Sequence, residues 1–341
     1  MDKTQNHRIV VAQRGGPDVL QLVGEDLPEP APGEVRVKVL TAGVSAYDVM
    51  LRSRRFPQFP RPPFTPGEDI VGVVDKLGQG ATGVTEGETV AGWSMGRGGG
   101  YTEYICMPAT ELVPVPPGVD PAEAVALVVN YLTAHMALHG TAGVRSGESI
   151  LVHGAAGGVG SALVQLGKLA GLEVFGTASL PKHEVVSELG ATPIDYRNED
   201  FVKRIRTLTG DGVDVVFDPV AGGRQLLRSY RALRKGGRLV MLGMVSSEEN
   251  GIRAIPFSLL TVGLLKLLPD GKRLPLSGGM EELPKNNALY RETLTEFLDW
   301  LAAGKIKPVM AVQVPLADAA RAHELLERGT HSGKVVLITD A

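Results

Sequence analysis

A glycine-rich turn between a strand and a helix constrains the fold of this chain more than any other feature. The motif Ala155-x-Gly157-x-x-Gly160 matches the dinucleotide-binding fingerprint, with Ala in place of its first glycine. An apolar strand over residues 149–153 precedes it and a helix over 161–170 follows it, as the fingerprint requires. Glycines there let the backbone approach a pyrophosphate, whose charge lies at the helix N-terminus. The alternative interpretation is a tight strand–helix turn without a ligand.

The residues that follow this turn indicate which dinucleotide it would bind. A site selective for NAD places Asp or Glu about 20 residues further on, to hold the ribose 2′-hydroxyl. Here that position falls at Thr177 to Ser179, and residues 174–183 contain no carboxylate. Lys182 lies just beyond, and Tyr196 ends the next segment. These groups suit a 2′-phosphate, so the sequence favours NADPH, although Lys182 alone could be a solvated surface residue.

The part of the chain from residue 149 onward alternates strands with helices, which predicts a doubly wound parallel sheet. The expected strands are residues 149–153, 173–177, 213–217 and 238–242, with helices over 161–170, 181–189 and 224–234. A helix over 122–138, begun by Asp120 and Pro121, precedes this region. After the alternating region, the sequence predicts a helix over 289–303, a strand over 309–314, a helix over 318–328 and a strand over 334–339.

The first third of the chain has a different sequence pattern, with short strands separated by Gly and Pro. Strands are expected over residues 35–39, 70–74, 89–91 and 104–106. Gly and Pro make up 66 of 341 residues, about 19%, whereas their usual share is roughly 12%. Many of them lie in these turns. The pattern predicts a small barrel or sandwich, and the length predicts two domains.

Composition narrows the possible partners. The 35 Lys and Arg residues nearly balance the 38 Asp and Glu residues, so nothing indicates a nucleic acid or an anionic membrane as partner. One cysteine allows no internal disulfide and no multi-thiolate metal site, which fits a cytoplasmic setting. The N-terminus lacks the apolar core of a signal peptide, and the apolar stretch 255–268 is too short to span a bilayer. We therefore expect a soluble protein.

Six motifs, taken in order, make almost the whole chain recognisable. They lie at residues 32–37, 42–53, 66–72, 155–160, 189–191 and 333–337. With them the chain resembles the zinc-independent quinone oxidoreductase (zeta-crystallin-like) branch of the medium-chain dehydrogenase/reductase superfamily. The resemblance implies a GroES-like catalytic domain over residues 1–122, completed by 282–341. It also implies a Rossmann NADPH-binding domain over 123–281, with the active site in the cleft between the two.

The zinc-dependent relatives of this branch have ligands that this chain lacks. They carry a Cys near the position of Ser45 and Gly-His-Glu where this chain has Gly67-Glu68-Asp69, whereas Cys106 is its only thiol. Catalytic zinc needs about three protein ligands, so we expect no metal. Without a Lewis acid to stabilise an alkoxide, the expected reaction is hydride transfer to a quinone or an α,β-unsaturated carbonyl.

The resemblance also implies site residues. The expected cofactor contacts are Thr133, Ala155, Gly157, Gly158, Val159, Gly160, Thr177, Ser179, Lys182, Tyr196, Val220, Gly243, Met244 and Lys334. Ser45 and Met50 stand where relatives often have Asn and Tyr, and they are expected in the substrate pocket. Tyr47 and Tyr131 are the candidate proton donors, although a buried Tyr is more often a packing residue and water can do the same job.

The expected activity is NADPH-dependent reduction of a small, electron-poor molecule. Two alternatives stay open: an enone or enoyl reductase with a specific metabolic substrate, and a non-catalytic NADPH-binding protein. Family members usually pair through a sixth Rossmann strand, here within residues 272–277, so we expect a homodimer. The apolar stretch 255–268 could cover the cleft, extend the dimer face or belong to the core.

Overall fold

The computed structural model describes residues 5–53, 60–220, 222–242, 254–275 and 280–339, with only the backbone of residues 254–259. The chain divides into two compact units. Unit 1 contains residues 1–132 and 283–341, and unit 2 contains residues 133–282. The boundary between residues 132 and 133 falls inside the helical segment that follows Asp120. The sequence predicts this boundary after residue 122.

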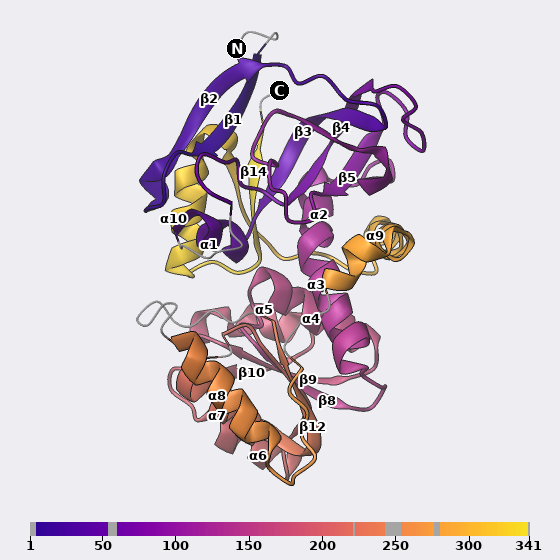
Figure 1. Ribbon diagram of the computed structural model, residues 1–341. Coiled ribbons are helices and arrows are strands. Elements are labelled where there is room, and N and C mark those ends of the chain that lie inside the picture. Colours follow the sequence, from indigo (N-terminus) through magenta and orange to yellow (C-terminus); the bar gives the residue numbers. More distant parts are fainter. Residues whose placement is uncertain (1–4, 54–59, 221, 243–253, 276–279, 340–341) are drawn as a thin grey trace. The chain divides into compact units, whose positions relative to one another are not determined.

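Unit 1 is built on a seven-stranded sheet with the order β13-β14-β3-β4-β5-β7, in which β6 also pairs with β3 (Figure 1). Its strands are β3 (Glu34–Val44), β4 (Asp69–Leu77), β5 (Thr89–Trp93), β6 (Tyr104–Pro108), β7 (Leu112–Pro114), β13 (Met310–Pro315) and β14 (Lys334–Ile338). A separate hairpin joins β1 (Gln5–Val11) to β2 (Leu20–Asp26). This is the expected GroES-like unit, completed by strands from the C-terminal segment.

The sheet of unit 1 follows the alternation that the sequence predicts. In β3 the side chains of Val35, Val37 and Val39 are fully buried, while those between them are half-exposed. Successive side chains of a strand point to opposite faces, so this pattern gives β3 one apolar face. These valines lie at the centre of the core of unit 1.

The helices of unit 1 are α1 (Ala46–Ser53), α2 (Pro121–Ala126), α9 (Asn287–Ala302) and α10 (Ala319–Arg328). Helix α2 begins as predicted, because the Asp120 carboxylate accepts a hydrogen bond from the amide of Ala122 at 2.8 Å. The single helix expected over 122–138 is interrupted, however. Two π-helical turns, Leu127–Tyr131 and Met136–Ala142, flank the short helix α3 (Leu132–His135).

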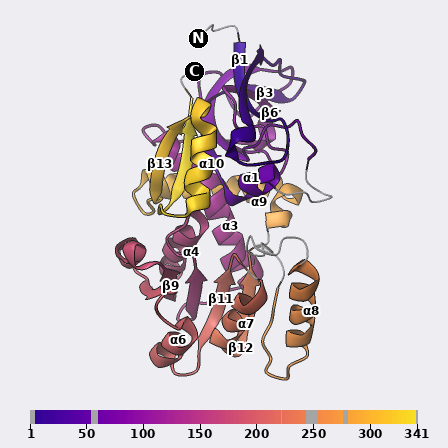
Figure 2. The same cartoon turned by 90° about the vertical axis from the view of Figure 1, so that its left-hand side faces the viewer.

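Unit 2 contains the expected doubly wound fold, with five parallel strands in the order β10-β9-β8-β11-β12. The strands are β8 (Ser149–His153), β9 (Glu173–Ala178), β10 (Thr192–Asp195), β11 (Val213–Asp218) and β12 (Leu233–Met241). The helices are α4 (Gly158–Leu169), α5 (His183–Glu188), α6 (Phe201–Thr209), α7 (Gly223–Ala232) and α8 (Ala254–Lys266). Helix α7 packs beside α6 and α8 (Figure 2). The strand order reverses between β8 and β11, and such switch points are where ligands bind.

Two elements of unit 2 were not predicted. Strand β10 contains Pro193, which its place at the edge of the sheet tolerates because an edge strand leaves one side unpaired. Helix α6 begins at Asp200, whose carboxylate accepts from the amide of Val202 at 3.0 Å. Asp200 is a typical N-cap residue, so this helix start has a signal in the sequence.

The segment around Arg273 extends the parallel sheet beyond β12. The amide of Arg273 donates to the carbonyl of Gly237, and the amide of Leu239 donates to the carbonyl of Arg273, both at 2.9 Å. This pairing lies where the sequence placed a sixth strand. In the described part of the chain, no helix is both long enough and apolar enough to cross a membrane.

Candidate functional site

The glycine turn lies where the fingerprint predicts it, at the carboxyl end of β8. Gly154 has a φ of 67°, a conformation that favours glycine. The amide of Ala155 donates to the carbonyl of Thr177 at 3.1 Å, and the amide of Gly157 donates to the carbonyl of Gly154 at 2.9 Å. The turn is therefore fixed to the end of β9 as well as to β8.

The first turn of α4 leaves backbone donors without acceptors. Within the described residues, the amides of Gly158, Val159 and Gly160 have no hydrogen-bond acceptor, and Gly157 at the N-cap has no side chain to supply one. The first amides of a helix carry its partial positive charge, which favours an anion. These three amides fit a pyrophosphate group.

The glycines of the turn have different roles. A Cβ at Gly160 would overlap the carbonyl oxygen of Gly154, so this glycine lets α4 pack against the turn. A Cβ at Gly176 would lie 2.6 Å from the Cβ of Ala155, so β9 also needs a glycine here. At Gly157 a Cβ meets only the oxygen of Gly154, at 3.3 Å. Packing within the described residues therefore demands glycine at 157 less than at 160 or 176.

Of the two hydroxyls predicted beside the ribose, one is already used by the fold. Thr177 is buried, and its Oγ1 lies 3.0 Å from Nδ1 of His153 and accepts from the amide of Gly154 at 3.4 Å. Thr177 therefore fixes the glycine turn. Ser179 follows β9 and begins the short helical turn Leu180–Lys182.

Two cations lie close together beyond the carboxyl ends of β9 and β10. Burial, and then the positive charge of the Arg197 guanidinium, lower the pKa of Lys182. Arg197 lies over the ring of Tyr196, at 5.8 Å from its centroid. Asp195 is committed to the amide of Arg197 and to the Asn198 side chain. A phosphate between the cations would offset their repulsion. The sequence predicts Lys182 and Tyr196 here, and the structure adds Arg197.

The other predicted cofactor residues of unit 2 lie in several places. Thr133 is half-buried in α3, between the two π-helical turns. Val220 follows β11 at the switch point, and its amide donates to Oδ1 of Asp218 at 2.9 Å. Gly243 and Met244 lie outside the described residues.

In unit 1, the predicted substrate residues gather on α1. Ser45 and Asp48 form a reciprocal cap at its start: Oγ of Ser45 donates to Oδ2 of Asp48 at 2.6 Å, and the amide of Asp48 donates back to Oγ of Ser45 at 3.3 Å. The Ser45 hydroxyl is therefore committed to Asp48. Met50 is half-buried on the same helix, and the Tyr47 side chain is 36% exposed.

Three carboxyls are buried near the start of β4. Asp48 accepts from the amide of Gly67 at 2.9 Å, and Asp69 pairs with Lys334. Glu68 is only 5% exposed, and its Oε2 accepts from Oγ of Ser94 at 3.0 Å and from a backbone amide. Burial, and then the nearby Asp48 carboxylate, raise the pKa of Glu68 to about 7. Burial also raises the pKa of Asp48, against the hydrogen bonds from Ser45 and Gly67.

Two predicted residues of unit 1 already have partners in the core. Nζ of Lys334 lies 2.7 Å from Oδ2 of Asp69, and both side chains are buried. The ammonium that was expected to contact the cofactor thus joins β14 to β4. Tyr131 is fully buried, and its ring packs edge-on against Phe297 with centroids 6.0 Å apart, which is the packing role left open for it.

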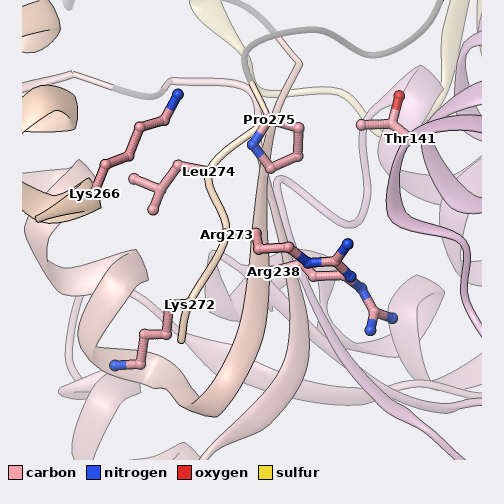
Figure 3. Close-up of a pocket in the computed structure, with 7 residues that line it drawn as sticks. All are labelled: Thr141, Arg238, Lys266, Lys272, Arg273, Leu274 and Pro275. Carbon is pink, nitrogen blue, oxygen red and sulfur yellow. The ribbon is translucent and has the colours of Figure 1, made fainter. Parts of the chain in front are cut away.

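Unit 2 also contains a pocket of about 460 Å³ whose lining includes none of the predicted cofactor residues (Figure 3). It is lined by Thr141, Arg238, Lys266, Lys272, Arg273, Leu274 and Pro275. Arg238 pairs with Glu148 and Lys272 with Asp270. In Figure 3 the Arg238 and Arg273 side chains lie side by side, whereas Lys272 points away from them. The glycine turn is therefore the better candidate for a dinucleotide.

Comparison with known proteins identifies the family. A family profile described as zinc-binding dehydrogenase matches residues 189–337, and one described as the alcohol dehydrogenase GroES-like domain matches residues 31–117. The quinone oxidoreductase of Rattus norvegicus is 32% identical over 338 residues, which cover 97% of each chain. This chain belongs to the zinc-independent quinone oxidoreductase and VAT-1 branch of the medium-chain dehydrogenase/reductase superfamily. The synaptic vesicle membrane protein VAT-1 homolog of Danio rerio is 33% identical and covers 97% of this chain and 70% of that relative.

Solved structures of the superfamily agree with the fold. A quinone oxidoreductase from Pseudomonas syringae is 32% identical, with a TM-score of 0.86 over 98% of this chain and 99% of that one. A mycobacterial protein solved with NADPH is 28% identical with a TM-score of 0.83, and an enoyl reductase is 26% identical with a TM-score of 0.84. Each covers 98% of this chain and 99% of its own.

Although the matching profile is described as zinc-binding, this chain lacks the Cys and His ligands of the zinc-dependent relatives. Ser45 and Glu68 occupy the positions of the Cys and His ligands in the zinc-dependent relatives of the quinone oxidoreductase branch. Among the residues that the structure describes, no group of three or more His, Cys, Asp or Glu side chains is arranged to hold a metal ion.

Proposed function

We propose that this chain is an NADPH-dependent oxidoreductase that transfers a hydride to a quinone or an α,β-unsaturated carbonyl. When bound, NADPH supplies the hydride, which is chemistry that no side chain can provide. The observation that carries the proposal is the glycine turn, where three helix amides without acceptors lie at the switch point of the sheet. The quinone oxidoreductases among its relatives support the reaction class.

The residues of unit 2 divide the work of binding. The amides of Gly158, Val159 and Gly160 would hold the pyrophosphate, and Lys182 with Arg197 would hold the 2′-phosphate. The relative solved with NADPH supports this cofactor. Residues 174–183 supply no carboxylate for the 2′-hydroxyl of NAD, which supports the same preference.

Replacing Lys182 tests this preference directly. Lys182→Ala should weaken NADPH binding by about 10- to 100-fold, because one charge-assisted hydrogen bond contributes about 1.5–3 kcal/mol. NADH binding should stay within about twofold of wild type. Calorimetric titration with both cofactors measures the two affinities. Lys203→Ala, at an exposed position of helix α6, is the matched control, and equal losses for both cofactors at Lys182 would remove it from the phosphate site.

Turnover with a panel of acceptors tests the reaction. We expect the purified chain to consume NADPH, followed by its absorbance, when given quinones or conjugated enones. The half-buried Met50 makes the expected acceptor side apolar, and the enoyl reductase among the structural relatives supports enones as the second candidate. Tight NADPH binding with no turnover on any acceptor would favour the non-catalytic alternative.

We also propose that the chain forms a homodimer through the edge of the sheet in unit 2. The segment at Arg273 pairs with β12 on one side only within the described residues. Leu264 and Leu267, in and after α8, are 58% and 80% exposed, which adds apolar surface to the same unit. Light scattering from the purified chain measures this state.

A further inference from the structure

A chain of buried hydrogen bonds joins the carboxyl ends of β8, β9 and β11 in unit 2. His153, the last residue of β8, lies between two hydroxyls. Its Nδ1 is 3.0 Å from Oγ1 of Thr177 on β9, and its Nε2 is 3.1 Å from Oγ of Ser229 on α7. Oγ of Ser229 donates in turn to Oδ2 of Asp218, the last residue of β11, at 2.7 Å. All four side chains are buried.

Each end of this chain reaches a segment that is expected to contact the dinucleotide. At one end, Oγ1 of Thr177 accepts from the amide of Gly154, at the start of the glycine turn, at 3.4 Å. At the other end, Oδ1 of Asp218 accepts from the amide of Val220, at the switch point of the sheet, at 2.9 Å. His153 therefore connects the glycine turn to the segment that follows β11.

The proton positions along the chain follow from Ser229. A hydroxyl has one proton, and that of Ser229 goes to Asp218, so Ser229 can only accept from His153. Nε2 is then the ring nitrogen that carries a proton. Burial lowers the pKa of His153, against the attraction of Asp218, and so keeps the ring neutral with a single N–H. Nδ1 therefore accepts a hydrogen bond from the hydroxyl of Thr177.

Two further side chains fix the orientation of the ring. Phe201 on α6 packs edge-on against His153, with ring centroids 4.8 Å apart and an angle of 75° between the planes. The nitrogen of the Gln225 side-chain amide lies 3.2 Å from Nε2 of His153, and a proton on Nε2 requires that the amide turn its oxygen toward the ring. With this tautomer both nitrogens of His153 are paired, and a fully paired buried network specifies one arrangement.

We propose that His153, with its proton on Nε2, is a positioning residue that holds the glycine turn and the segment at Val220 in a fixed relation, so that both contact one dinucleotide. The proposal rests on the proposed function. His153 is only 6% exposed, and it acts through Thr177 and Ser229 rather than by contact with the ligand.

The first measurement needs no cofactor. In the 15N-labelled full chain, long-range 1H–15N NMR shows which ring nitrogen of each histidine is protonated, and His153→Phe assigns the signals by their loss. We expect His153 to carry its proton on Nε2 and none on Nδ1. A proton on Nδ1 would reverse the hydrogen bond to Thr177 and overturn the proposal.

Ser229→Ala tests whether the chain reaches the cofactor site. Ser229 donates to Asp218 and not to the glycine turn, so its removal acts on the turn through His153. We expect NADPH and NADH to bind more weakly by the same factor, about 2- to 30-fold, because they share the pyrophosphate. Calorimetric titration measures both affinities, and wild-type affinities in Ser229→Ala would overturn the proposal.

The matched control is Ser149→Ala. Oγ of Ser149 also donates to a buried carboxylate, that of Asp214, at 3.0 Å. This pair lies at the amino ends of β8 and β11, at the other end of the same two strands. Ser149→Ala should therefore keep both wild-type affinities. A loss as large as that of Ser229→Ala would assign the effect to general loosening of the sheet and overturn the proposal.

A cycle of double variants separates this proposal from the proposed function. Thr177→Val and Ser229→Ala remove the partners of opposite nitrogens of His153, so their effects on the unfolding constant in urea should not multiply. The double variant should differ from the product of the single effects by about twofold or more. Thr177→Ser keeps the hydroxyl, so its effect should multiply with that of Ser229→Ala. Effects of Thr177→Val and Ser229→Ala that multiply would overturn the proposal. Coupled effects in a chain that binds no NADPH would contradict the proposed function and leave the connection through His153 in place.

Discussion

Gly157→Val is expected to abolish binding of NADPH and NADH alike while the chain still folds. The backbone at Gly157 has φ −80° and ψ 176°, which valine adopts readily, and an added Cβ meets only the oxygen of Gly154. The methyl groups of valine would stand in front of the amides of α4. Losing two charge-assisted hydrogen bonds of about 1.5–3 kcal/mol each weakens binding by about 150- to 20,000-fold.

Calorimetric titration and thermal unfolding, measured together, separate binding from folding in this variant. The matched control is Gly160→Ala, whose Cβ would overlap the carbonyl of Gly154. It should lower the free energy of unfolding by about 1–3 kcal/mol, because the turn and α4 must move apart. Full cofactor affinity in a folded Gly157→Val chain would show that the pyrophosphate binds elsewhere.

Lys334→Met should produce the largest loss of stability in unit 1. It leaves the Asp69 carboxylate buried without its cation, and breaking a buried pair in this way costs about 3–5 kcal/mol. Urea unfolding measures the loss. The double variant Asp69→Asn with Lys334→Met removes both charges and should recover much of it. Weaker NADPH binding with unchanged stability in Lys334→Met would instead make Lys334 a cofactor contact, as the family resemblance implies.

Most of the fold could be predicted because its strands and helices are short and are separated by Gly and Pro residues. Strand β8 begins and ends where the apolar run does, and the capped start of α2 is confirmed. Helix α6 was missed because its buried face rests on only two residues, Phe201 and Ile205, in a charged segment. The π-helical turns near Tyr131 could not be predicted, because no local pattern distinguishes them from α-helical turns.

The part of the candidate site that could be predicted is the part formed by backbone groups. The glycine turn is local, so its sequence determines its geometry. Arg197 lies near Lys182 because the ends of β9 and β10 meet, which no local pattern reveals. The hydrogen bond between Ser45 and Asp48 does have a signal in the sequence, because the two residues have the spacing of a capping box. The burial and raised pKa of Glu68 needed the tertiary structure, because its partners Ser94 and Gly96 are distant in sequence.

The position of β14 has a consequence for how the protein is made. This strand comes last in sequence among the described strands, yet it lies inside the sheet of unit 1, between β13 and β3. Translation at roughly 5–20 residues per second separates Val44 of β3 from Lys334 of β14 by about 15–60 s. During that time unit 2 can be completed, while β3 waits with one edge unpaired. A nascent chain of this protein therefore needs protection at that edge until its last strand leaves the ribosome.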